Sequence, residues 1–397
     1  MDAADEKQTD QGATAPWSWS PRLNRVMETL AGTLVAVSVF GAAVTCSSIV
    51  EPLSGLSAVL AWGLLFFGAV YLALAVHEFG HYLGARIRRM SVLAVAIGPI
   101  ELRAVVGGWR LRRCRSEYAR EVGGYVLAFP DPERPARRDC AVMLLGGPLA
   151  NLALALALGA MLATMAASSW QLLCIALALL NFAGFGANLL PYQSRSLASD
   201  GLQLLQLRHW PADAQKDPGQ VWMRLIGRSL RGVTADELPE SELRVLAERA
   251  DVLPLLDEWF RLKALQNLGE WRRVDALERA LNRRVSALDE TLLVAMSRSF
   301  LPLLRAEIAF CRSMASGDAG HIEAIGLAPA VQRDAPYLMP RLQALAAGLR
   351  GDAERSAAAM ERSRAAAETS IDVATRRCEG RLRGYMQAMI EQRQTAS

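Results

Sequence analysis

The chain has 397 residues, of which 52% are hydrophobic, and its formal net charge is +4. The charges are unevenly distributed, because residues 29–50, 54–76 and 140–194 contain no charged side chain. Uncharged runs of this length exclude an ordinary soluble protein. The six cysteines are scattered and form no CxxC pair, which excludes a disulfide framework and a cysteine-based zinc site.

The first 25 residues are polar and mixed in charge. They lack the basic-then-apolar order of a signal peptide, and the apolar run that follows them is too long for one. Residues 1–25 are therefore interpreted as a disordered cytoplasmic tail.

Four transmembrane helices are predicted next, because a membrane span needs roughly 20 apolar residues. They lie near residues 27–50, 55–82, 141–165 and 170–192. The segment between the second and third helices carries twelve arginines, whereas the short loops 51–54 and 166–169 carry no Lys or Arg. This asymmetry places the arginine-rich segment and both termini in the cytoplasm.

The segment between the second and third helices also contains short apolar and β-branched runs broken by Gly and Pro. "SVLAVAIGPIELRAVVGGWRLRR" and "EVGGYVLAFPDPERP" are typical of short strands and turns. Because the segment is too short for an inserted domain, it is interpreted as small β elements at the cytoplasmic membrane face. In the following helix, Gly146, Gly147 and Ala150 would let a neighbouring backbone come close.

The rest of the chain is charged, and its Leu, Ala and Arg recur at helical spacing. The step from Gly317 to Gly351 is 34 residues, the tetratricopeptide period, so a stack of helix pairs and an irregular helical bundle both fit. The predicted fold class is an α-helical polytopic membrane protein with membrane-face β elements and an all-α soluble C-terminal domain. The chain is predicted to have three parts: the tail 1–25, a membrane-embedded core 26–210 and the helical domain 211–397.

The sequence "HEFGH" ends the second uncharged run and places His77 and His81 one helical turn apart, on one face. Two imidazoles at this spacing can hold one metal ion, and Glu78 beside them can act as a general base. A chance match of this kind is common on soluble helices, where the side chains face water. Ionisable groups at membrane depth are costly unless they are paired or metal-bound, which favours a functional site.

A catalytic zinc normally has three protein ligands, so a third must come from another part of the chain. Asp200, in "LASDG" after the last predicted span, is the best candidate. A helix that starts at Asp200 and Gly201 would aim this carboxylate back at the histidines.

Three motifs in this order resemble the site-2 protease family of intramembrane zinc metalloproteases: "HEFGH", "LLGGPLANL" and "NLLP…SDG". The resemblance covers residues 55–210. It implies one zinc ion per chain held by His77, His81 and Asp200, with Glu78 as the base. It also implies that four residues of the later motifs line the substrate path or support the site: Gly147, Pro148, Asn151 and Asn188.

One departure concerns the spacer before the aspartate, because eight residues separate Pro191 from Asp200, more than in the commonest family form. A longer loop can still return the carboxylate, since the entropy of loop closure grows slowly with length. The alternative to a protease is an inactive relative that acts as a membrane adaptor. A transporter would need charged residues in several spans, and only one span carries them.

The expected activity is therefore cleavage of a transmembrane segment near the cytoplasmic face of the bilayer. An unwound substrate could add a strand to the edge of "EVGGYV" or a neighbouring strand. The helical domain is expected to bind a protein partner, to gate access or to recognise the substrate's cytoplasmic part. Nucleic acid binding is not expected, because the positive charge lies beside the membrane, where it suits anionic lipid. The Ala-, Arg- and Leu-rich composition suits a high-GC bacterium, so the expected location is a bacterial inner or plasma membrane.

Overall fold

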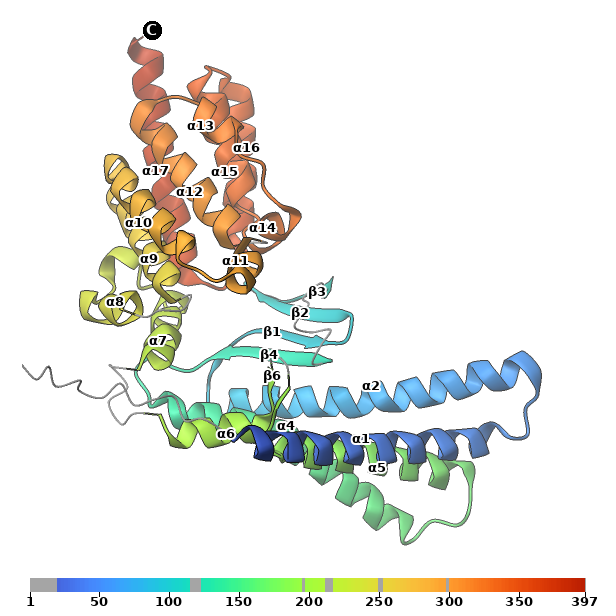
Figure 1. Ribbon diagram of the computed structural model, residues 1–397. Coiled ribbons are helices and arrows are strands. Elements are labelled where there is room, and N and C mark those ends of the chain that lie inside the picture. The colour runs from blue at the N-terminus through green and yellow to red at the C-terminus, as the bar shows by residue number, and fades with distance from the viewer. Residues whose placement is uncertain are drawn as a thin grey trace, which may run out of the picture.

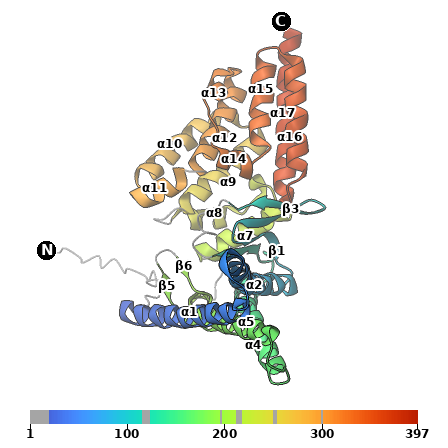
Figure 2. The same cartoon turned by 90° about the vertical axis from the view of Figure 1, so that its right-hand side faces the viewer.

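The computed structural model describes residues 20–114, 123–194, 197–210, 217–248, 253–297 and 300–396. Most of the predicted tail over residues 1–25 therefore lies outside the described residues. The molecule has three layers, which are a bundle of long helices, a small sheet and a C-terminal group of helices (Figure 1). The same order is visible after a quarter turn (Figure 2).

Four long helices form the bundle. They are α1 (Pro21–Val50), α2 (Gly55–Ile87), α4 (Ala136–Leu162) and α5 (Ser169–Leu189). Each is long and apolar enough to cross a membrane, as the sequence predicted. Large apolar side chains cover the outer surface of the bundle; Phe40 is 71% exposed and Leu64 is 78% exposed. An apolar surface of this extent suits lipid better than water.

Small residues fill the interior of the bundle. Ala42, Ala69 and Ala176 are buried between the helices, and α2 crosses α4 where Gly80 meets Gly146. A Cβ atom at either glycine would collide with the backbone of the other helix. The predicted close approach at Gly146 is therefore present, and it brings the end of α2 directly against α4.

The sheet consists of four antiparallel strands. They are β1 (Ser91–Ile97), β2 (Ile100–Val105), β3 (Gly108–Arg113) and β4 (Gly124–Phe129). Their order is β3-β2-β1-β4, so β3 and β4 are the edge strands. The register pairs Ile97 with Gly124, and a bulge interrupts it between Val92 and Ala94. The predicted strands are present; their place at the membrane face stays a prediction.

A separate hairpin of two short strands lies in the long spacer that follows Pro191. Its strands are β5 (Gln193–Ser194) and β6 (Leu197–Ala198), and α6 (Asp200–Arg208) begins directly after it. The eight residues that depart from the commonest family spacing thus contain secondary structure of their own.

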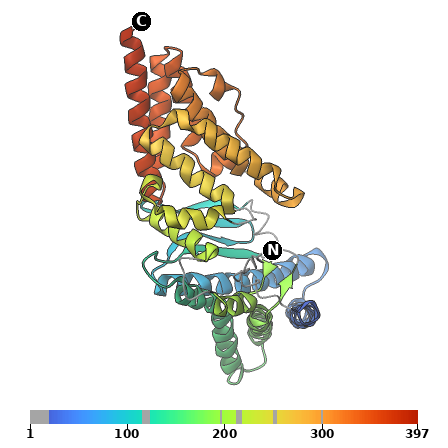
Figure 3. The same ribbon diagram turned by 60° about the vertical axis from the view of Figure 1, so that its left-hand side comes forward.

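The C-terminal helical region comprises residues 217–396. It contains α7 (Pro218–Leu230), α8 (Glu240–Ala247), α9 (Leu253–Leu268), α10 (Val274–Ser286), α11 (Glu290–Ser297), α12 (Phe300–Ser316), α13 (Gly320–Glu323), α14 (Pro329–Asp334), α15 (Leu338–Leu349), α16 (Ala353–Glu368), α17 (Val373–Ala396) and the 3-10 turns Ala235–Glu237 and Trp271–Arg273. Neighbouring helices such as α15 and α16 pack side by side (Figure 3). The tetratricopeptide-like stack stays a prediction.

Buried charges lie in the core of this region. Arg341 is fully buried and forms ion pairs with Glu307 and Glu379, while Lys263 contacts Glu307 at 3.2 Å. The guanidinium of Arg341 also lies 4.5 Å from the centre of the Phe310 ring. The four side chains Lys263, Glu307, Arg341 and Glu379 form the buried charge cluster.

The C-terminal helical region also contacts the sheet. The ring of Trp222 on α7 meets Phe129 at the end of β4, with 5.6 Å between ring centres. At the far side of the sheet, the Val106 N–H donates to the carbonyl of Thr369. All six cysteines of the chain are buried and unpaired.

Candidate metal centre

The two motif histidines lie in the last third of α2. The helix continues without a break from the apolar span to Ile87, so His77 and His81 share one face of it. Both side chains are buried, and their Nε2 atoms are 3.0 Å apart. The structure thus brings together the two residues that the spacing placed on one face.

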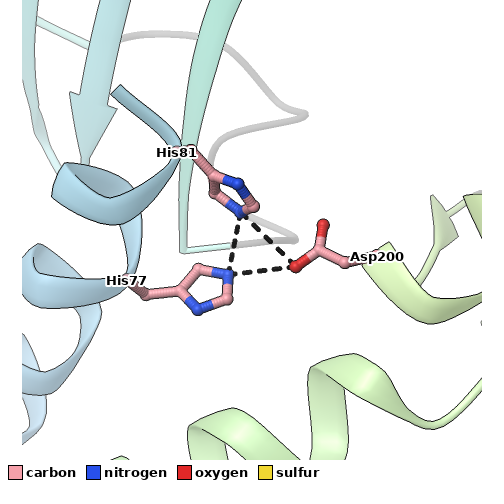
Figure 4. Close-up of side chains that lie close together, drawn as sticks. All are labelled: His77, His81 and Asp200. Carbon is pink, nitrogen blue, oxygen red and sulfur yellow. Dashed lines mark hydrogen bonds and ion pairs between the residues drawn. The ribbon is translucent and has the colours of Figure 1, made fainter. Parts of the chain in front are cut away.

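Asp200 stands opposite the histidines, at the first residue of α6. Its Oδ2 atom lies 3.2 Å from Nε2 of His77 and 3.4 Å from Nε2 of His81. Figure 4 shows the three side chains pointing at one another from two different helices. Their ligand atoms all lie within 4.8 Å of one another, which is the arrangement that a single metal ion requires.

Ser199 fixes the position of Asp200 through the N-cap of α6. Its Oγ accepts a hydrogen bond from the Leu202 N–H at 3.2 Å and donates one to the Leu190 carbonyl at 2.7 Å. The same oxygen accepts the Tyr192 N–H at 3.1 Å. These bonds tie the start of α6 to the end of α5. The residue pair Ser-Asp, with serine as a preferred cap, was the sequence signal that could have found this role.

Helix α4 holds the outer sides of both imidazoles. The carbonyl of Met143 lies 2.8 Å from Nδ1 of His81, and the amide of Asn151 lies 3.4 Å from Nδ1 of His77. A Cβ atom at Gly147 would come within 2.8 Å of the His77 ring, so only glycine lets α4 pass this close. Contacts of this kind orient metal-binding imidazoles and fix their tautomers.

Glu78 is buried beside the histidines, and its Oε2 atom has no hydrogen-bond partner within the described residues. On its open side lies β4, where a Cβ atom at Gly124 would come 2.7 Å from Oε1 of Glu78. Gly124 therefore gives the carboxylate the space that a larger residue would take. A buried carboxylate without a partner is costly unless a ligand or water occupies its free oxygen.

A cavity of about 470 Å³ opens in front of these side chains. Asn188 lines it together with Tyr125 and Tyr192, whereas Pro148 is buried inside α4. The amide of Asn188 donates to the Gly184 carbonyl of its own helix at 2.9 Å. Burial, and to a lesser degree the nearby Glu101, raises the pKa of Tyr125 to about 12, so its phenol stays neutral.

The centre holds two carboxylates, those of Glu78 and Asp200, beside the two imidazoles. Neither carboxylate forms an ion pair with a lysine or arginine in the part of the chain that the structure describes. Two histidines and one carboxylate are also a known ligand set for catalytic zinc.

The family comparison agrees with this geometry. Residues 65–167 match the family model of peptidase family M50, the site-2 protease family. The match includes His77, Glu78, His81 and Asn151 and ends before Asn188 and Asp200. Comparison with curated proteins and with solved structures gave no significant match.

The match over residues 65–167 confirms the resemblance that the sequence motifs carried. The family is one of membrane-associated zinc metalloproteases, and it also includes inactive members. Together with the four apolar helices, the match indicates an integral membrane protein.

Proposed function

We propose that this protein is an intramembrane zinc metalloendopeptidase that cleaves a transmembrane segment of a membrane protein. The observation that carries the proposal is the convergence of His77, His81 and Asp200, with Glu78 buried beside them. A membrane adaptor would not require a costly arrangement of an unpaired buried glutamate beside three metal-ligand atoms, whereas a metalloprotease would.

His77, His81 and Asp200 would hold the zinc ion. When bound, zinc polarises the scissile carbonyl and makes a water molecule acidic near neutral pH. The Met143 carbonyl accepts the Nδ1–H of His81, which leaves Nε2 of that ring free to ligate. The amide nitrogen of Asn151 is the atom that lies 3.4 Å from Nδ1 of His77. The carboxamide would accept the Nδ1–H of His77 after a flip that exchanges its nitrogen with its oxygen, which accepts no hydrogen bond within the described residues.

Glu78 would act as general base. Its unpartnered oxygen can take a proton from the attacking water and return it to the leaving amine. The burial of Glu78 keeps bulk solvent away from this transfer. Gly124 leaves room for the Glu78 carboxylate itself beside β4.

The depth of the centre indicates where the cut would be made. His77 lies 22 positions after Gly55, which at about 1.5 Å per residue is roughly 33 Å along the helix. The hydrocarbon core of a bilayer is about 30 Å thick. These lengths support cleavage near the cytoplasmic boundary, and the arginine distribution supports both chain termini on the cytoplasmic side.

An edge strand beside the centre supports strand addition by the substrate. β4 pairs with β1 on one side only, and Gly124, Tyr125 and Val126 line the cavity. A helical substrate hides its peptide groups in its own hydrogen bonds, so it must unwind before it can be cut. Pairing with the free edge of β4 would hold the unwound segment extended. Of the predicted segment "EVGGYV", residues 121 and 122 lie outside the described residues.

The C-terminal helical region is placed to influence this strand. Trp222 packs on Phe129 at the end of β4, and Arg231 forms an ion pair with Asp131 just after it. These contacts favour a gating role, in which a protein partner or the substrate's cytoplasmic part shifts β4. A chain that ends at residue 215 should process other substrates or lose its regulation, and unchanged processing would reject this role.

The decisive test compares cells that carry the wild type with cells that carry Glu78→Gln. The substitution keeps the shape of the side chain but removes the base, so cleavage should fall by about 10²–10⁴-fold. The uncut membrane protein should accumulate, and its cytoplasmic fragment should disappear. The substrate is identified in the same experiment by comparing membrane-protein fragments.

Zinc analysis of the purified protein separates the protease from the adaptor. One zinc per chain is expected in the wild type and in Glu78→Gln, and it should be lost in His77→Ala. Unchanged fragments under several stresses, together with a wild type free of zinc, would favour the adaptor.

A further inference from the structure

The hairpin formed by β5 and β6 connects the last bundle helix to Asp200. Gln193 pairs with Ala198 across the hairpin, and Ala198 is two residues before Asp200. The Ser199 N–H also donates to the Tyr192 carbonyl at 2.9 Å. The position of this hairpin therefore sets the position of the Asp200 carboxylate.

Asn24, in the first turn of α1, holds the outer edge of β5. Its Nδ2–H donates to the Gln193 carbonyl at 2.8 Å, and its Oδ1 accepts the Gln193 N–H at 2.6 Å. The carboxamide thus occupies both backbone groups of Gln193, as a neighbouring strand would. This contact links residues 169 positions apart, from the first helix of the chain to the segment before α6.

The other strand of the hairpin is held in a similar way. The Gln203 side chain on α6 donates to the Ala198 carbonyl at 3.0 Å. The outward-facing backbone groups of Gln193 and the carbonyl of Ala198 are therefore hydrogen-bonded to side-chain amides. Among the described strands that line the cavity, β4 is the one that would offer an edge to the substrate, and the hairpin forms another wall of the cavity.

We infer that Asn24 is a positioning residue of the metal centre: its carboxamide fixes the β5–β6 hairpin to α1 and thereby sets where the Asp200 carboxylate stands. The inference rests on the proposed zinc site for its functional meaning. It also explains how this chain uses a longer spacer than the commonest family form, because the added residues have an anchor of their own. Residues that orient metal ligands typically change metal affinity by 10–100-fold when they are replaced.

The test uses the full-length protein in detergent micelles and measures two quantities. The first is zinc affinity, determined by competition with a chelator. The second is amide hydrogen exchange at Gln193, Ser199 and Leu202. Asn24→Ala should weaken zinc binding by about 10–100-fold and should speed exchange at these amides.

Two further variants control the experiment. Gln193→Ala removes an exposed side chain but leaves the backbone groups that Asn24 binds, so it should match the wild type. Asn24→Asp keeps the acceptor for the Gln193 N–H and loses the donor, so it should lie between the wild type and Asn24→Ala.

The outcomes separate this inference from the proposed function. Wild-type zinc affinity and wild-type exchange in Asn24→Ala would overturn the inference. A wild type that binds no zinc would overturn the proposed function. In that case, faster exchange in Asn24→Ala would still show that Asn24 holds the β5–β6 hairpin. Unchanged exchange would overturn the inference about Asn24 as well.

Discussion

Two regions of the molecule bury several ionisable side chains, and they do so in opposite ways. In the buried charge cluster, Lys263 and Arg341 offset the charges of Glu307 and Glu379. In the metal centre, Glu78 and Asp200 have no such cation among the described residues. Buried charge is tolerated when it is compensated. The first region supplies its own compensating cations, whereas the second is compatible with an added cation.

The largest effect is expected when the buried charge cluster is broken. Arg341→Leu would leave two carboxylates buried without their shared partner, which should cost about 3–5 kcal/mol of local stability. Hydrogen exchange of the α12 and α15 amides in the full chain measures this loss. Arg364→Leu is the matched control, because its pairs with Glu361 and Glu368 lie at the surface and should contribute little to stability. Equal effects of the two variants would contradict the comparison.

The metal centre should respond to zinc where the buried charge cluster does not. Zinc at 100 times its dissociation constant should stabilise the bundle by about 2.7 kcal/mol relative to the zinc-free protein. Thermal melting with and without a chelator measures the difference, and His77→Ala should abolish it. Exchange of the α12 amides should stay the same in both conditions. A zinc effect that survives in His77→Ala would show that the ion binds elsewhere.

Close packing of α2 on α4 holds the centre together, so a methyl group there should be harmful. Gly80→Ala would push against Gly146 and Ala150 and should cost about 1–3 kcal/mol. Gly68→Ala on the same helix meets nothing within 4 Å and should be neutral or slightly stabilising, because alanine favours helix. Melting temperatures of the two variants provide the test. If both raise the melting temperature, the helices do not touch at Gly80.

The smallest effect is a pH dependence of the buried charge cluster. Burial alone would raise the pKa of Glu307, but Arg341 and Lys263 lower it below its ordinary value of about 4.3. A lowered native pKa contributes stability above the unfolded value, and this stability is lost as the pH falls toward the native value. Burial raises the pKa of Glu379, which opposes part of the effect.

Unfolding of the α12 and α15 region should therefore become easier below about pH 4.3, and Glu307→Gln should weaken this trend. Hydrogen exchange corrected for its intrinsic pH dependence measures it. A local stability that rises as the pH falls from about 5 to about 3 would contradict the expected loss.

The sequence predicted those features that local patterns determine. The four long helices follow from uncharged runs, and the pairing of His77 with His81 follows from helical spacing. Asp200 was proposed from its place after the last span, and the structure puts its carboxylate within 3.4 Å of both imidazoles. Its role as a zinc ligand stays a prediction.

Other features could not be read from the sequence because they depend on contacts between distant segments. The amide of Asn24 meets Gln193, and the glycine at position 80 meets Gly146 across two helices. No periodicity marks such pairs. The strand order that leaves β4 at an edge likewise depends on how β1 pairs with both of its neighbours. The tetratricopeptide-like period is a different case, since two glycines at a repeat distance do not fix how helices stack.

The burial of the native cysteines has a practical consequence for labelling. Thiol reagents attack exposed thiolates, and burial raises the pKa of Cys311 to about 12. A single cysteine introduced at Leu127, which is 40% exposed on β4, would therefore be the fastest-reacting thiol in the folded protein. Photocrosslinkers or spin labels can thus be attached to β4 while all six native cysteines stay in place.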